Sequence, residues 1–133
     1  MKILQANIWQ GRLAKSFIGL IKEVDPDIIT LQEVCNCNDA DFQTLAFSSF
    51  EDITSSFSYP HQVLAPTYSF SVMNHEVFFS NVVLSKLPIV DNKIVFTNLE
   101  FKRYFDTKQD DYNIRNFVHA ELEVNNSKVN VIT

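Results

Sequence analysis

Residues 27–34 of this chain read Asp-Ile-Ile-Thr-Leu-Gln-Glu-Val. Apolar and β-branched side chains dominate this run, which is typical of a strand buried on both faces. Residues 2–9, Lys-Ile-Leu-Gln-Ala-Asn-Ile-Trp, form a second short run that is apolar enough for a buried strand. The two runs predict a pair of strands in the first part of the chain.

A helix is predicted between these strands. Apolar residues recur there at helical spacing, at Leu13, Phe17, Leu20, Ile21 and Val24. Pro26 ends the helix because proline disfavours helical geometry in the residue before it. A strand, a helix and a strand in this order make a βαβ unit, whose two strands are expected to be parallel with a right-handed crossover.

The rest of the chain predicts mainly antiparallel strands. Residues 39–58 are expected to hold one or two short helices, which Tyr59-Pro60 ends. Strands are expected at 61–65, 68–73, 77–85, 89–96, 114–124 and 128–133, separated by turn residues. Asn125-Asn126 predicts a hairpin turn, and residues 106–113, which lack periodicity, predict a loop. The fold class is therefore α/β.

Composition excludes some phosphate-binding sites. The chain has 2 glycines in 133 residues, where average usage of about 7% gives roughly 9. Two glycines cannot build a glycine-rich phosphate loop, so P-loop and dinucleotide-binding sites are excluded. The net charge of −5, from 11 Lys+Arg and 16 Asp+Glu, argues against tight binding of nucleic acid by charge alone. A phosphate substrate would need added positive charge, most simply a metal ion.

The sequence shows neither a signal-peptide core nor a membrane-spanning apolar run, so we expect a cytoplasmic protein without a membrane segment. Cys35 and Cys37 form a Cys-Asn-Cys sequence, with no second Cys or His pair at zinc spacing. Two reduced loop thiols are therefore favoured over a metal site.

Asn7 and Glu33 lie near the carboxyl ends of the two predicted parallel strands. Ligands of α/β folds gather at that edge of the sheet, so the topology brings an amide and a carboxylate together. An ionised group with apolar neighbours is costly unless it is paired or metal-bound, and Mg²⁺ is often held by one or two carboxylates with water and phosphate. A solvated or lysine-paired carboxylate is the alternative for Glu33, and position alone does not choose between them.

Several weaker candidates have simple structural interpretations. His119, in an apolar run, is expected to be a hydrogen-bonded strand histidine, and His75-Glu76 a solvated pair. Residues 101–105, Phe-Lys-Arg-Tyr-Phe, mix cations with aromatics as single-strand binders do, but an edge strand or loop is favoured. Arg115 and Asn116 are candidate substrate-binding residues: Arg115 would contact a substrate phosphate, and Asn116 would lie beside it. Ordinary polarity at a strand start explains them equally well.

Three blocks together resemble the endonuclease/exonuclease/phosphatase superfamily, which has the DNase I-like fold. They are residues 5–9 (Gln-Ala-Asn-Ile-Trp), 27–34 and 81–89 (Asn-Val-Val-Leu-Ser-Lys-Leu-Pro-Ile), and the Leu-Gln-Glu-Val of the second is the most specific. Ser80 stands where the third motif usually has glycine. Residues 115–133 resemble the strand pair that leads to the family's Thr/Ser-His motif, and their Arg-Asn opening looks closest to the tyrosyl-DNA phosphodiesterase branch.

The resemblance implies half of a two-sheet β-sandwich with flanking helices, and a metal-dependent phosphoester hydrolase of nuclease or phosphatase type. Glu33 matches the family's metal-binding glutamate, and Asn7 matches the asparagine that helps place the metal and the scissile phosphate. Both are therefore the catalytic and metal-binding candidates. The expected cofactor is Mg²⁺, with Mn²⁺ as an alternative. The expected partner is a phosphoester substrate; nucleic acid, phosphoinositide, phospholipid and protein-DNA adduct remain open.

The family's central His, and the Asp-x-Asn and Asp-His motifs that come after it, are not found following the strand pair of residues 115–133; the Asp-x-Asn triplet at residues 111–113 lies before that pair. We therefore expect residues 1–133 to be the N-terminal part of one domain whose C-terminal half is absent. On its own, this part is expected to be catalytically inactive. A fragment of a longer enzyme and a natural half-domain both fit, and residues 129–133, a strand without a polar tail, favour the fragment. Uncovered strand edges predict self-association or pairing with the missing half. The alternative function is a non-catalytic binding or assembly module.

Overall fold

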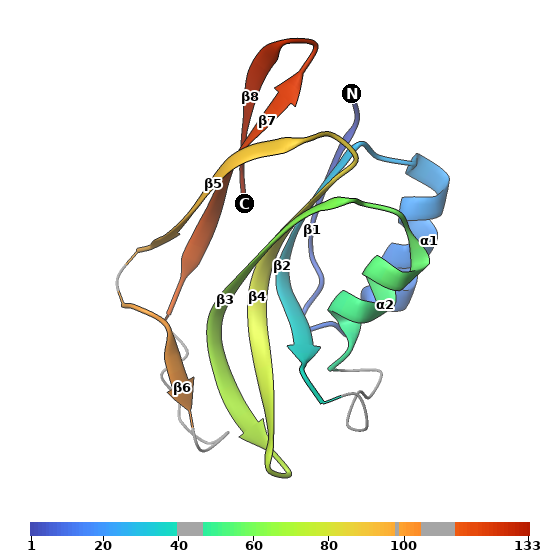
Figure 1. Cartoon of the computed structure of the whole chain (residues 1–133). Coiled ribbons are helices and arrows are strands. Elements are labelled where there is room, and N and C mark those ends of the chain that lie inside the picture. The colour runs from blue at the N-terminus through green and yellow to red at the C-terminus, as the bar shows by residue number, and fades with distance from the viewer. Residues whose placement is uncertain (40–46, 98, 105–113) are drawn as a thin grey trace.

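The computed structural model describes residues 1–39, 47–97, 99–104 and 114–133. In these residues, α1 (Ala14–Val24) and α2 (Ser49–Ser56) cover one face of a five-stranded sheet, and a three-stranded sheet packs on the other face (Figure 1). The larger sheet has the spatial order β1 (Ile3–Asn7), β2 (Ile28–Cys37), β4 (His75–Ser85), β3 (His61–Val72) and β6 (Lys102–Tyr104); the smaller has β5 (Ile89–Phe96), β7 (Asn116–Val124) and β8 (Ser127–Ile132). The predicted α/β class, with two sheets and flanking helices, is confirmed.

The predicted βαβ unit is confirmed. β1 and β2 are parallel, with residues 3–7 paired to residues 28–32. α1 ends before Pro26, as predicted, because Asp25 takes a left-handed conformation with φ 47°. The Asp25 N–H then donates to the Ile21 carbonyl at 2.9 Å and caps the helix.

α1 buries a narrower stripe than the sequence predicts. Ala14, Phe17 and Ile21 are buried, whereas Leu13 and Leu20 are 45% and 40% exposed. The buried residues follow at i, i+3 and i+7, along one side of the helix. Leu20 lies about 100° around the helix from Ile21, and Leu13 precedes the first turn, so both fall outside the stripe.

β3 is one strand where the sequence predicts two, at 61–65 and 68–73. Its register with β4 shifts between Pro66 and Tyr68, which makes Thr67 the extra residue of a β-bulge. Proline has no N–H for the ladder and is tolerated at bulges. Pro66 therefore interrupts the pairing locally without ending the strand.

Two hairpins have turns with left-handed residue pairs. Met73 and Asn74 join β3 to β4 with φ 49° and 69°, and Asn125 and Asn126 join β7 to β8 with φ 50° and 62°. Positive φ at both central residues characterises a type I′ turn, whose twist matches that of the flanking strands. The hairpin predicted at Asn125-Asn126 is confirmed.

α2 confirms a short helix within 39–58. β6 pairs in parallel with β3 at the sheet edge and confirms the edge-strand interpretation for residues 102–104 of the 101–105 stretch; Phe105 lies outside the described residues. The predicted loop at 106–113 and residues 40–46 of the predicted helical region lie outside the described residues. Across the described ranges, no helix combines the length and the apolar character needed to cross a membrane.

Two apolar clusters hold the three layers together. The cluster between the helices and the larger sheet includes Phe17, Ile21, Ile29, Leu31, Val34, Ile53, Val82 and Leu84. The cluster between the sheets includes Ile28, Val63, Ala65, Val83, Val118, Ala120, Leu122 and Val131. Ile28 and Ile29 enter different clusters because successive strand residues point to opposite faces. This confirms that β2 is buried on both faces.

Replacing Thr30 with valine should stabilise the fold. The Thr30 hydroxyl is buried and has no hydrogen-bond partner among the described residues. Thr30→Val removes this unpaired group and keeps the shape of the side chain, so we expect the free energy of unfolding to rise by about 1 kcal/mol. Urea unfolding measures it. Thr54→Val is the control, because the Thr54 hydroxyl donates to the Phe50 carbonyl at 2.9 Å and its loss should not stabilise. A destabilised Thr30→Val variant would contradict the prediction.

Stability should fall at high pH. Tyr59 is 3% exposed, and its hydroxyl donates to the Pro26 carbonyl at 2.9 Å. Burial, then the carboxylates of Asp25 and Asp27, raises the pKa of Tyr59 from 10.0 to about 12. The folded state thus favours the neutral phenol, and this stabilisation is complete below pH 10 and is lost between about pH 10 and 12. Urea unfolding from pH 8 to 11 should show the decline, and Tyr59→Phe should show a smaller one; equal slopes would refute the assignment.

Candidate active site

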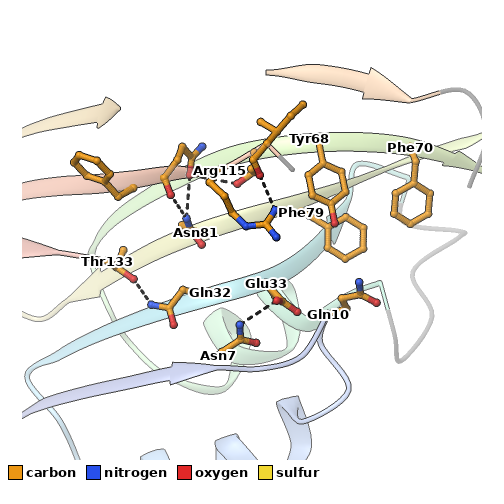
Figure 2. Close-up of a pocket in the computed structure, with 14 residues that line it drawn as sticks. Asn7, Gln10, Gln32, Glu33, Tyr68, Phe70, Phe79, Asn81, Arg115 and Thr133 are labelled. Carbon is orange, nitrogen blue, oxygen red and sulfur yellow. Dashed lines mark hydrogen bonds between the residues drawn. The ribbon is translucent and has the colours of Figure 1, made fainter. Parts of the chain in front are cut away.

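Asn7 and Glu33 meet at one edge of the larger sheet. Asn7 is the last residue of β1 and pairs with Gln32 of β2, so Glu33 follows directly beside it. Asn7 Nδ2 donates a hydrogen bond to Glu33 Oε1 at 3.0 Å (Figure 2). The predicted juxtaposition of this amide and this carboxylate is therefore present in the fold.

Glu33 lies at a β-bulge, where the sequence predicts a strand end. β2 continues to Cys37, and its register with β4 shifts between Leu31 and Val34, so Gln32 and Glu33 stand opposite one residue of β4. Glu33 has a left-handed φ of 57°, which costs a non-glycine residue about 1–2 kcal/mol. Bulges re-aim side chains and such strain gathers at functional sites. Here Glu33 is half-buried in a strand whose other residues beyond the bulge are buried.

The turn after β1 fixes the orientation of Asn7. Trp9, Gln10 and Gly11 have φ 47°, 54° and 81°, three consecutive left-handed residues of which only the glycine adopts this conformation without strain. Asn7 Oδ1 accepts the Trp9 N–H at 2.8 Å. Because its oxygen is held in this way, the Asn7 NH₂ group is directed at Glu33.

The opposite wall of the site is held by a buried amide, Asn116, at the start of β7. Asn116 Oδ1 accepts Asn81 Nδ2 at 3.0 Å and the Thr67 hydroxyl at 3.3 Å. Asn116 Nδ2 donates to the carbonyls of Ala65 and Pro66 at 3.4 and 3.0 Å. These four contacts fasten the smaller sheet to β3 and β4, and they engage both polar atoms of the Asn116 amide.

Arg115 precedes this amide, is exposed, and lies across the cleft from the Asn7–Glu33 pair (Figure 2). Its Nη1 donates to the Ile114 carbonyl at 2.9 Å, which restrains the guanidinium. Between the two walls, Gln32 Nε2 donates to the Thr133 hydroxyl and joins β2 to the segment after β8. The structure thus brings Arg115, Asn7 and Glu33 to one cleft, with Asn116 in its wall.

The cleft has a volume of about 590 Å³ and a polar and an aromatic end. Its polar lining comprises Asn7, Gln10, Gln32, Glu33, Thr67, Asn81, Arg115, Asn116 and Thr133, and its apolar lining Tyr68, Phe70, Phe79, Ile114 and Phe117. The ring centroids of Tyr68 and Phe70 each lie 5.0 Å from that of Phe79, in stacked arrangements. The aromatic end is thus packed by side chains of β3 and β4.

The donor chemistry of the cleft fits a hard divalent cation. Glu33 supplies a carboxylate, and the amide side chains of Gln32 and Asn81 also line the cleft; the Asn7 oxygen is engaged by the Trp9 N–H. Oxygen ligands are those that Mg²⁺ and Mn²⁺ prefer. Among the described residues, no group of three or more His, Cys, Asp or Glu gathers at one place. A site with one carboxylate suits Mg²⁺, which commonly keeps several waters and binds phosphate oxygens.

The two cysteines lie in β2, not in a loop as predicted, because β2 continues past Val34. Both are free and buried. Burial, then the charges of Glu33 and Glu51, raises the pKa of the Cys35 thiol from 9.0 to about 12. A protonated thiol is a poor metal ligand, but it can donate a hydrogen bond, and Cys35 Sγ lies 3.2 Å from the Gln10 carbonyl oxygen.

The histidines lie away from the cleft in the described part of the chain. His119 Nε2 is 2.7 Å from Asn130 Oδ1 on the neighbouring strand, which confirms the prediction of a hydrogen-bonded strand histidine. His75 Nδ1 lies 2.6 Å from Asp39. The prediction of a solvated His75-Glu76 pair was wrong, because Glu76 accepts a hydrogen bond from Ser69 at 2.7 Å and pairs with Arg103.

Sequence reasoning assigned no role to Gln10, Gln32, Thr67 or Asn81, which all line the cleft. Asn81 carried a usable signal, since Ser80 and Asn81 interrupt the apolar run of residues 77–84 in β4 and a polar amide must find partners when buried. Thr67 gave none, because its position depends on the bulge after Pro66.

Comparisons with family models and with curated proteins give no match. Solved structures do match. An endonuclease/exonuclease/phosphatase family protein from Leptotrichia buccalis has a TM-score of 0.63 and 17% identity over 100% of this chain and 52% of its own. A humanized D. rerio TDP2 has a TM-score of 0.61 and 12% identity over 99% and 45%. An endonuclease/exonuclease/phosphatase from Bacteroides vulgatus has a TM-score of 0.61 and 14% identity over 98% and 50%.

These likenesses extend over nearly all of this chain and concern the fold. The chain spans about half the length of the solved structures it matches. The chain therefore has the DNase I-like fold of endonuclease/exonuclease/phosphatase proteins, over about half of their length.

Proposed function

We propose that this chain supplies the metal-binding part of a divalent-metal-dependent phosphoester hydrolase. The contact between Asn7 Nδ2 and Glu33 Oε1, at the end of the parallel β1–β2 pairing, carries the proposal. Glu33 would hold Mg²⁺, and Asn7 would orient the carboxylate and help place the phosphate. A cation bound there would neutralise phosphate charge and polarise the phosphoryl oxygen.

Arg115 is proposed to contact the substrate phosphate from the other wall. A guanidinium suits this role because it is always charged and presents a planar set of donors to phosphate oxygens. Asn116 was predicted beside Arg115 as a second substrate-binding residue, and this stays a prediction. We assign it a supporting role, since its amide already makes four contacts within the protein.

We further propose that the chain is the N-terminal part of one domain and that it does not turn over substrate alone. The family's His, and the Asp-x-Asn and Asp-His motifs that follow it, would activate water and stabilise the transition state, and none of them follows the strand pair of residues 115–133 in this sequence. Pairing with a complementary half would supply them. The exposed apolar residues Ile3 of β1 and Ile132 of β8 favour such pairing or self-association.

The test separates metal binding from phosphate binding. Isothermal titration should detect Mn²⁺ binding to the chain, and inorganic phosphate binding should be detectable only with the metal present. Arg115→Ala should weaken the phosphate affinity about tenfold or more, the scale of one charge-assisted hydrogen bond, and leave the Mn²⁺ affinity unchanged. Lys93→Ala, which removes an exposed cation on β5, is the control.

Absence of Mn²⁺ binding would refute the metal assignment. Robust Mg²⁺-dependent hydrolysis by the chain alone would refute its proposed inactivity.

A further inference from the structure

We propose that Cys35 is a positioning residue for the Asn7–Glu33 pair, acting through the turn at Trp9 and Gln10. The inference rests on the proposed function of that pair. Cys35 Sγ donates to the Gln10 carbonyl oxygen at 3.2 Å, from a side chain that is 0% exposed. The thiol thereby ties β2 to the turn that follows β1.

The turn needs such a tie. Trp9 and Gln10 are non-glycine residues with positive φ, a strained conformation that persists only where contacts impose it. The other described hydrogen bonds of the backbone of residues 9–11 go to Asn7 Oδ1 and to residues 12 and 14. Ile8, directly before the turn, donates its N–H to the Gln32 carbonyl of β2 at 3.1 Å. Among the described contacts of residues 9–11, the bond from Cys35 is the one that reaches β2.

Cys35 is itself held firmly. The hydroxyl of Ser49, the first residue of α2, accepts the Cys35 N–H at 2.9 Å and donates to the Cys35 carbonyl at 3.1 Å. Ser49 is also 0% exposed. The backbone that carries the thiol is therefore fixed from the helix layer, and the thiol is a rigid support for the Gln10 carbonyl.

These contacts form a closed path that begins and ends on β2. Glu33 Oε1 accepts a hydrogen bond from Asn7 Nδ2, and Asn7 Oδ1 accepts one from the Trp9 N–H. The carbonyl of the following residue, Gln10, accepts a hydrogen bond from the Cys35 thiol. Without the thiol the turn can relax, the Trp9 N–H moves, and the Asn7 amide loses the contact that fixes its orientation. The Glu33 carboxylate would then be less well aimed.

The expected effect follows from how outer groups tune metal sites. Replacing a group that orients a ligand directly typically costs 10–100-fold in metal affinity. Cys35 acts through the turn and Asn7, so we expect a smaller loss, of about fivefold, for Cys35→Ala. Cys35→Ser keeps a hydroxyl that can donate to the Gln10 carbonyl, and it should restore most of the affinity.

Cys37→Ala is the matched control. Cys37 lies two residues further along β2, is also buried at 1% exposure, and packs in the same apolar cluster as Cys35. Both alanine variants remove one buried sulfur, so a general loss of packing would affect them alike. Mn²⁺ titration and the NMR signals of the Asn7 side-chain amide in the metal-free chain provide two independent measurements.

The inference is supported if Cys35→Ala weakens Mn²⁺ binding about fivefold and shifts the Asn7 amide signals, while Cys35→Ser and Cys37→Ala stay close to the original chain. It is overturned if Cys35→Ala binds Mn²⁺ normally, or if both alanine variants lose affinity equally. Should the unsubstituted chain bind no Mn²⁺, the proposed metal function fails separately. In that case the NMR signals of the Asn7 side-chain amide test the positioning role of Cys35. A shift of these signals in Cys35→Ala but not in Cys37→Ala supports the role, and the absence of such a shift overturns it.

Discussion

Glu33→Gln should lower the Mn²⁺ affinity of the chain by at least about 100-fold. Glu33 is the one carboxylate side chain among the described residues that line the cleft, so its replacement removes the side-chain negative charge there. Outer groups that merely orient a ligand are worth 10–100-fold in metal affinity, and loss of the ligand itself should reach or exceed the upper end of that range. In a complete enzyme the same change should abolish metal-dependent turnover.

The fold should survive this substitution. Glutamine has the same shape, and its side-chain oxygen can still accept the hydrogen bond that Asn7 Nδ2 gives to Glu33 Oε1. The free energy of unfolding should therefore change by less than about 1 kcal/mol. Because the Glu33 charge helps to raise the pKa of the Cys35 thiol, that pKa should also fall in Glu33→Gln, although burial keeps it above its ordinary value.

Mn²⁺ titration, urea unfolding and a spectroscopic thiol titration measure the three effects. Glu23→Gln, an exposed glutamate on α1, is the control, for which the Mn²⁺ affinity should stay unchanged. Unchanged affinity in Glu33→Gln would remove Glu33 from the metal site. An unfolded variant would instead show that the carboxylate is structural, as a partner that holds Asn7 and the bulge.

The meeting of Asn7 and Glu33 could be predicted because it follows from topology. A βαβ crossover makes the two strands parallel and adjacent, which brings their carboxyl ends to one edge whatever the details of packing. The bulge at Glu33 could not be predicted in this way. Nothing in the neighbouring sequence predicts the Glu33 φ of 57°, since glutamate does not favour that conformation. The bulge arises from the pairing of β2 with both β1 and β4.

At two places the local sequence predicts a strand end that the structure does not have. Pro66 indicates a strand break when read alone, but β4 pairs with β3 on both sides of it and absorbs the proline in a bulge. Cys35 and Cys37 follow the recognisable strand motif and resemble loop residues, yet β4 extends the pairing of β2 to Cys37. In both cases long-range pairing overrides a local preference, as it commonly does in sheets.

The link between the two sheets was also beyond the sequence. Asn81 and Asn116 are 35 residues apart, and their contact depends on how the smaller sheet settles on the larger one. From sequence alone, a substrate contact and ordinary strand-start polarity are equally good interpretations of Asn116. Its burial at 6% exposure and its four side-chain contacts favour a third role, that of a latch between the sheets.

Asn116→Ala should therefore destabilise the fold by about 3 kcal/mol. The substitution removes the Asn116 side chain as a partner of the Thr67 hydroxyl and of the carbonyls of Ala65 and Pro66. The Asn81 amide loses one of its two bonds and keeps the one to the Asn116 backbone carbonyl at 2.7 Å. Each buried polar group left unpaired costs about 1–3 kcal/mol, although water entering the cleft will satisfy some of them. Asn92→Ala, at an exposed position of β5, is the control, for which we expect a change within about 0.5 kcal/mol.

Asn116→Asp separates the latch from a substrate contact. Aspartate can still accept from Asn81 and Thr67, but it turns an acceptor toward the carbonyls of Ala65 and Pro66, which Asn116 Nδ2 contacts now. A buried carboxylate facing carbonyl oxygens is unfavourable, so this variant should be at least as unstable in urea as Asn116→Ala. If Asn116 served the substrate instead, both variants would keep their stability and lose phosphate affinity. Loss of stability together with weaker phosphate binding fits the latch, because Arg115 is the adjacent residue and is placed by the same strand.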